Sequence, residues 1–382
     1  MLNDNTIDDK RGFVSVFRAL FGLAGIKLVL ALIGIFLFFV VAIGVQEAVK
    51  AIESNRQVLA ELEAQGIPAA ERQHDSRLIS PWRQGSNASL RFLGSRNAET
   101  IARQTTIVGM AALGMTLVII SGGIDLSVGS IVALSTVVIA YLLQKIGAGP
   151  LTAVAGGVVA GAFCGLISGT LITSLRVVPF IVTLGMMLVV RGMAKLIGQN
   201  QKIDVDTEHL RWLDELMASI PKDRSWMLLP LGVWLLIFMA IVIAFLLRYT
   251  RLGRHIFAIG SNEQTARLCG VSVGRVKVIV FMLSGAFAGL AGLMQFSRLT
   301  VGDPTVAVGL ELDVIAAVVI GGGSLSGGEG SILGTIVGAL IMTVIASGCT
   351  QMGLANYWQE IITGAIIVIA VALDRLRHRR AD

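Results

Sequence analysis

The residues best suited to contact a polar solute lie at two interruptions of otherwise apolar sequence. Each interruption combines paired glycines with serines, and a constant spacing pairs Gly122 with Gly323 and Ser130 with Ser331. Paired breaks of this kind often lie near the substrate path of a transporter. We therefore predict a translocation path that includes Gly122, Gly123, Asp125, Ser127, Gly129, Ser130, Gly322, Gly323, Gly330 and Ser331.

Asp125 ends an apolar run, and a carboxylate near a membrane is a functional candidate because its burial is costly. It could bind a polar substrate. It could also hold the broken helix by accepting hydrogen bonds from the backbone N–H groups of Ser127 and Val128. We favour the second role, because Asp followed by Ser at a break is good capping chemistry.

A second group of acids, Asp303, Glu311 and Asp313, lies at the start of a later apolar segment. Acids at an outer mouth could receive Lys or Arg from an external protein, which makes the three residues candidates for docking a binding protein. They are equally suited to the first turn of a helix, where the dipole favours negative charge. The sequence leaves both interpretations open.

Composition places these residues in a membrane protein. The chain is 54% hydrophobic and 15% charged, with a mean hydropathy of +0.79. A soluble protein of 382 residues would carry about a quarter charged residues. The four histidines show no metal-ligand spacing, and the net charge of +6 resides in short basic segments rather than in a nucleic-acid surface. We predict neither a metal nor a cofactor bound by this chain.

The apolar pattern predicts an all-α polytopic fold with about ten transmembrane helices, some of them broken or re-entrant. The two interruptions are separated by six spans, an even number, so the internal repeat is expected to be parallel. Spans are expected at 28–45, 101–121, 127–145, 150–173, 178–197, 227–247, 278–297, 308–322, 331–349 and 357–373.

Charge sets the expected orientation and the boundaries of the domains. Basic residues crowd the loop 248–277 and the end of the chain, so both should be cytoplasmic, and the acid-rich loop 198–226 should lie outside. We predict a cytoplasmic segment 1–27, a membrane anchor 28–45, a periplasmic helical insertion 46–97, a transmembrane domain 98–375 and a cytoplasmic tail 376–382. The insertion is either a helical spacer or a docking surface for an external partner.

The basic loop contains the signals of a short helix. Ser261 or Asn262 can cap a helix that begins at Glu263, and Gly270 can end it in the left-handed conformation. Such a helix on the cytoplasmic face could be a handle for an external motor. The segment 325–329 resembles the signature of ABC ATPases, but it lies between apolar spans and the chain has no phosphate-binding loop. The chain should therefore not hydrolyse ATP by itself.

Several long motifs closely resemble those of ribose/xylose/arabinose-type ABC transporter permeases. They occupy 114–130, 178–187, 191–192, 251–254, 262–271 and 311–322, and the similarity covers 97–375 in the family's order. The resemblance implies a bacterial inner-membrane subunit that pairs with a second permease copy in the lipid bilayer. It also implies a periplasmic sugar-binding protein and cytoplasmic ABC ATPase subunits that use ATP. The ATPase-coupling candidates are Asn262, Glu263, Ala266 and Gly270.

The resulting expectation is import of a monosaccharide or related polyol without enzymatic chemistry on it. The alternative is a secondary sugar transporter coupled to an ion gradient, which would need acids at the middle of the membrane. The sequence identifies neither the sugar nor the residues that touch it. The insertion 46–97 is longer than the corresponding connection in typical family members.

Overall fold

A computed structural model of the chain describes residues 23–72, 75–206, 211–218 and 229–378. Within them, seven helices are long and apolar enough to cross a membrane. The prediction of an all-α polytopic membrane protein is therefore confirmed. The seven helices are α2 (Leu23–Ala64), α5 (Ser95–Ile120), α7 (Pro150–Leu175), α8 (Pro179–Ile197), α10 (Leu231–Tyr249), α13 (Val273–Leu299) and α15 (Ile332–Gln351).

Two further helices of the bundle are too short to cross a bilayer upright. α6 (Val128–Gln144) and α14 (Leu310–Ile320) span about 25 Å and 16 Å at 1.5 Å per residue, against a hydrocarbon thickness of about 30 Å. The last helix, α16 (Asn356–His378), carries an apolar stretch over its first part. The expected short spans therefore exist, and each begins inside the protein.

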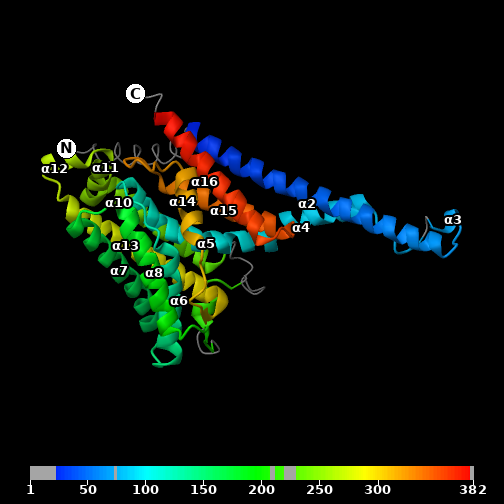
Figure 1. Ribbon diagram of the computed structural model, residues 1–382, viewed down its shortest axis with the longest axis horizontal. Helices are drawn as coiled ribbons and strands as arrows, with labels where there is room; N and C mark the ends of the chain where they lie inside the picture. Colours follow the sequence, from blue (N-terminus) through cyan, green and yellow to red (C-terminus); the bar gives the residue numbers. More distant parts are fainter. Residues whose placement is uncertain (1–22, 73–74, 207–210, 219–228, 379–382) are drawn as a thin grey trace, which may run out of the picture.

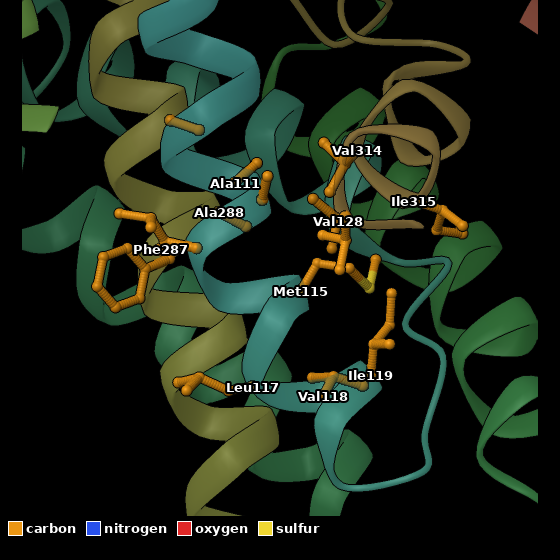
Figure 2. Close-up of a cluster of buried hydrophobic side chains, with 14 of the residues drawn as sticks. Ala111, Met115, Leu117, Val118, Ile119, Val128, Phe287, Ala288, Val314 and Ile315 are labelled. Atoms are coloured by element: carbon orange, nitrogen blue, oxygen red, sulfur yellow. The ribbon is translucent and has the colours of Figure 1, made fainter. Parts of the chain in front are cut away.

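The centre of the bundle is α5, which is almost wholly buried over its last sixteen residues. Helices α13, α14 and α15 pack around it. Figure 2 shows Met115 of α5 together with Val128, at the start of α6, and Val314 of α14, and all three belong to one buried cluster. Because Val128 lies near Met115 and not near the end of α5 at Ile119, the connector between the two helices turns back into the bundle (Figure 2).

Glycines allow α7 and α13 to approach at backbone distance. A Cβ added to Gly161 would collide with the carbonyl of Gly285, and one added to Gly165 would collide with the carbonyl of Phe281. Gly157, Gly161, Gly165 and Gly169 recur every fourth residue and so form one face of α7. Small residues at this spacing are the usual basis of tight helix packing in lipid.

The insertion forms an outer hairpin that projects from the bundle, with α3 (Ala69–Arg72) at its far end (Figure 1). α2 continues without interruption for 42 residues, about 63 Å, which is twice the hydrocarbon thickness. α4 (Pro81–Leu93) returns along it. Asn55 joins the two arms by accepting from Ile79 N (2.8 Å) and donating to Ile79 O (2.7 Å). The anchor and the start of the insertion, expected as two segments, are one helix.

Small elements complete the fold outside the long helices. β1 (Ile203–Asp204) pairs antiparallel with β2 (Val301–Gly302), with Ile203 opposite Gly302, and α9 (Arg211–Glu215) lies nearby in sequence. The basic loop contains α11 (Arg251–Ser261) and α12 (Glu263–Leu268). Most of the predicted segment 1–27, part of the loop 198–226 and the end of the tail 376–382 lie outside the described residues.

Candidate functional site

The two interruptions fold into the same backbone motif. At the end of α5, Gly122 N donates to Ile119 O (2.9 Å) and Gly123 N donates to Val118 O (2.9 Å), while Gly122 adopts a φ of 78°. This paired arrangement is the Schellman motif, which requires a left-handed residue that glycine supplies best. α14 ends in the same way, with a φ of 91° at Gly322.

The structure corrects the pairing expected from the sequence spacing. Gly122 corresponds to Gly322, not to Gly323, because these two residues are the left-handed ones. The next helices begin after Ser127 and Ser331, so Ser331 corresponds to Ser127 and not to Ser130. The second connector, 321–331, is four residues longer than the first, 121–127. A constant spacing could not reveal this, because it assumes connectors of equal length.

The two interruptions meet each other beneath α11. Gly328 N donates to Ile120 O (2.9 Å), which joins the second connector to the end of α5. A Cβ added to Gly260 of α11 would collide with Ile120 O and with Gly328 N, so α11 rests on both. Both interruptions therefore lie on the face of the bundle that carries the basic loop, as a parallel repeat requires.

Asp125 is fully buried within the first connector. Its Oδ1 accepts from Ser127 N (3.0 Å) and Ser127 Oγ (2.6 Å), and its Oδ2 accepts from Ser284 Oγ (3.1 Å) of α13. The favoured capping role fits these contacts, although Ser284 takes the place expected for Val128. Ser284 lies about 16 Å along α13 from Val273, so Asp125 lies beside the middle of α13.

The start of α6 faces the start of α14. A Cβ added to Gly129 would collide with Oε2 of Glu311 and with the carbonyl of Ala307. Glu311 lies about 14 Å from the end of α14 at Ile320, which also places it near mid-depth. Two short helices thus present their N-termini to one region inside the bundle, the arrangement by which discontinuous helices bind substrates in transporters.

Arg191 reaches this region from α8. It lies about 18 Å from the start of α8, and its guanidinium donates to Val306 O (2.6 Å) and Pro304 O (3.1 Å). Arg191 thus holds the segment between α13 and α14.

The three predicted docking acids do not form one outer surface. Asp303 is buried, accepts from Thr305 N (2.8 Å), and pairs with Lys202 (3.2 Å). Glu311 and Asp313 are partly exposed but belong to the first turn of α14, at mid-depth. The positions of Glu311 and Asp313 suit helix-start residues favoured by the dipole. Docking of an external protein by the three acids stays a prediction.

The short helix expected in the basic loop is present. The Asn262 side chain accepts from Thr265 N (2.8 Å) at the start of α12, and Gly270 ends the helix with a φ of 83°. Glu263 pairs with Lys277 (2.6 Å) and with Arg267 (3.1 Å). The hydrogen bond from Lys277 holds the pKa of Glu263 below its usual value. Ala266 is buried while its neighbours in α12 are exposed, so one side of the helix is fixed and the other is free.

The sequence prediction lacks two features of this region. The predicted basic loop contains the additional helix α11, which Thr250 caps by accepting from Gly253 N (3.2 Å). Thr followed by a helix-compatible segment was the available signal. Arg191 carries no signal of its own, because its partners lie more than a hundred residues away. Among the described residues, no group of three or more His, Cys, Asp or Glu side chains could hold a metal ion.

Comparison with known proteins agrees with this architecture. The family described as branched-chain amino acid transport system / permease component matches residues 97–371. The ribose import permease protein RbsC of Escherichia coli K12 is 39% identical over 294 residues, which cover 77% of this chain and 90% of the relative.

Two relatives carry the names of other sugars. The L-arabinose ABC transporter permease protein AraH of Azospirillum brasilense is 38% identical. The aligned region covers 76% of this chain and 83% of AraH. The fructose import permease protein FrcC of Rhizobium meliloti is 35% identical, covering 75% and 79%. No solved structure matches significantly.

Proposed function

The chain belongs to the family of transport-system permease components, and from that premise we propose that it imports a monosaccharide or related polyol. It is the multi-pass inner-membrane subunit of an ABC transporter. The proposal of a sugar substrate rests on relatives that are named for ribose, arabinose and fructose import. The ion-coupled alternative finds mid-depth acids in Asp125 and Glu311, but it has no support among the relatives.

The energy for transport comes from partner subunits. ABC ATPases on the cytoplasmic face would bind and hydrolyse ATP, since the chain has no phosphate-binding loop of its own. α12 is suited to be their handle, because most of its residues are exposed while Ala266 and the Glu263–Lys277 pair fix it to α13. α11 would pass a movement of α12 to both interruptions, since it contacts each of them.

A second permease copy would cover the face formed by α8 and α14. Arg191, Glu311 and Asp313 are partly exposed there at mid-depth, and a charged group facing lipid tails is costly. Val308 and Leu188 lie exposed on the same two segments and supply apolar contact area. The substrate path would then run between the two copies, past the N-termini of α6 and α14. A periplasmic binding protein would deliver the sugar to its outer end.

The test uses cells that lack the gene for this chain. We expect loss of uptake of at least one of labelled D-ribose, L-arabinose and D-fructose, and recovery when the chain is restored. An ATPase subunit should copurify with the tagged chain. Proteoliposomes that hold the chain alone should accumulate no sugar under a proton or sodium gradient. Accumulation in that last experiment would favour the ion-coupled alternative.

A further inference from the structure

Two buried polar atoms near the N-terminus of α6 have no hydrogen-bond partner. One is Oε2 of Glu311, which lies against Gly129, and the other is Oγ of Ser130, the next residue in the chain. Ser130 is fully buried. Buried polar groups are almost always hydrogen-bonded, and leaving one unpaired costs about 1–3 kcal/mol. Two such atoms on neighbouring positions indicate a place for a ligand.

The charges beside these atoms are separated, not paired. Glu311 and Arg191 are close enough for their charges to attract each other, yet no ion pair joins them. The Arg191 guanidinium is held by the carbonyls of Pro304 and Val306, which prevents it from swinging onto the carboxylate. A carboxylate and a guanidinium fixed apart can be bridged by a molecule that offers both donors and acceptors.

The start of α6 adds backbone donors to the same region. The first N–H groups of a helix have no partner within the helix. Ser127, the residue before α6, does not cap them, because its hydroxyl donates to Asp125 instead. Glycine at position 129 keeps this end of the helix open, since any side chain there would strike Glu311.

From this geometry we propose that Glu311 is a specificity-determining residue that accepts hydrogen bonds from the hydroxyls of a sugar in transit. Arg191 and the unpaired N–H groups at the start of α6 bind the oxygens on the other side of the same molecule. The substrate class that fits is a neutral polyol, because the carboxylate repels an acid sugar. This inference rests on the proposed function and names the residue that distinguishes one substrate from another.

The experiment compares variants in proteoliposomes that hold the complete transporter with its ATPase and binding protein. The probes are labelled D-ribose, L-arabinose and D-fructose. Since one binding protein serves every variant, a changed ratio between probes must arise in the membrane subunit. We expect Glu311→Leu to lower uptake by about 10- to 100-fold, the loss typical for a hydrogen bond to a charged acceptor. Glu311→Gln should retain partial uptake and change the ratio between probes.

Glu360→Gln is the control, because it removes an exposed carboxylate from α16, outside α8 and α14. It should leave the ratio between probes unchanged. All three variants should keep ATP hydrolysis stimulated by the binding protein, which shows that the transporter has assembled. Wild-type uptake by Glu311→Leu, or an equal change of ratio in Glu360→Gln, would overturn the assignment. Absence of uptake of every probe by the wild-type transporter would instead remove the proposed function and this inference with it.

Discussion

Single residues in this protein matter mainly through the backbone they hold. Asp125 accepts hydrogen bonds from Ser127 in its own connector and from Ser284 of α13, so it fixes the first connector to α13. Arg191 similarly ties α8 to the segment before α14 through two carbonyls. In a membrane, where no water replaces a lost partner, such contacts determine where a chain can leave the helical conformation. Polar residues at mid-depth therefore mark the places where the bundle is broken.

Glu263 provides a test at the scale of the residue. Replacing it with Arg would place three cations together, because Lys277 and Arg267 both contact its carboxylate. Repulsion of about 1 kcal/mol should loosen α12 from α13. We expect ATP hydrolysis that no longer drives sugar uptake, with the protein still in the membrane. Gln264→Arg, which changes an exposed neighbour, is the control. Wild-type uptake in Glu263→Arg would refute the coupling role.

The same residue predicts a pH dependence. The pKa of Glu263 lies below its usual value of 4.5 because Lys277 donates a hydrogen bond to it. A depressed pKa means that the contact contributes fully above the unfolded value and is lost as the pH falls through the folded one. Titration of Glu263 should therefore leave the coupling of ATP hydrolysis to sugar uptake unchanged from pH 8 to about pH 5. A Glu263→Gln variant measured over the same range should show coupling that is weaker and equally flat.

At the scale of the element, close packing of α7 on α13 fixes the frame around the site. Gly161 and Gly165 of α7 meet carbonyls of α13, so a larger side chain at either position cannot be accommodated by rotation of a flexible neighbour. α13 in turn supplies Ser284 to Asp125 and Lys277 to Glu263. One helix thus joins α12 to the first connector, and its position depends on these glycines.

The prediction for this element uses two glycines in different surroundings. Gly165→Leu should destabilise the folded protein by about 1–3 kcal/mol or prevent folding, since overpacking against backbone cannot relax. Gly34→Leu in α2 should have little effect, because nothing lies within 4 Å of the added Cβ. Thermal unfolding in detergent measures both. Equal stability of the two variants would contradict the close contact between α7 and α13.

The whole molecule is asymmetric across the membrane. The two interruptions and the helices α11 and α12 lie on one face, while the outer hairpin projects from the bundle at the end of α2 (Figure 1). The family match begins at residue 97, after α4, so the hairpin lies outside the matched region. Two hydrogen bonds between Asn55 and Ile79 hold the hairpin together. The proposed path thus lies in the part shared with the relatives.

Cysteine labelling tests this arrangement. The native Cys269 is exposed beside α12, and Ser326→Cys would expose a thiol in the second interruption. Both should react with an impermeant reagent from the same side of the membrane. Ser54→Cys, in the outer half of α2, should react only from the opposite side when Cys269 is replaced by Ser. Labelling of Ser326→Cys and Ser54→Cys from one side would contradict this orientation.

The sequence alone was enough to predict what depends on local pattern. Apolar runs of membrane length predicted the helices, and Asn262 and Gly270 predicted the ends of α12, because each signal acts over one turn. Only the tertiary structure decided how deep the short helices begin, which carbonyls Arg191 holds, and how the two interruptions correspond. These three features depend on contacts between residues far apart in the chain and on connector length. The hydrophobic periodicity of a single helix predicts neither.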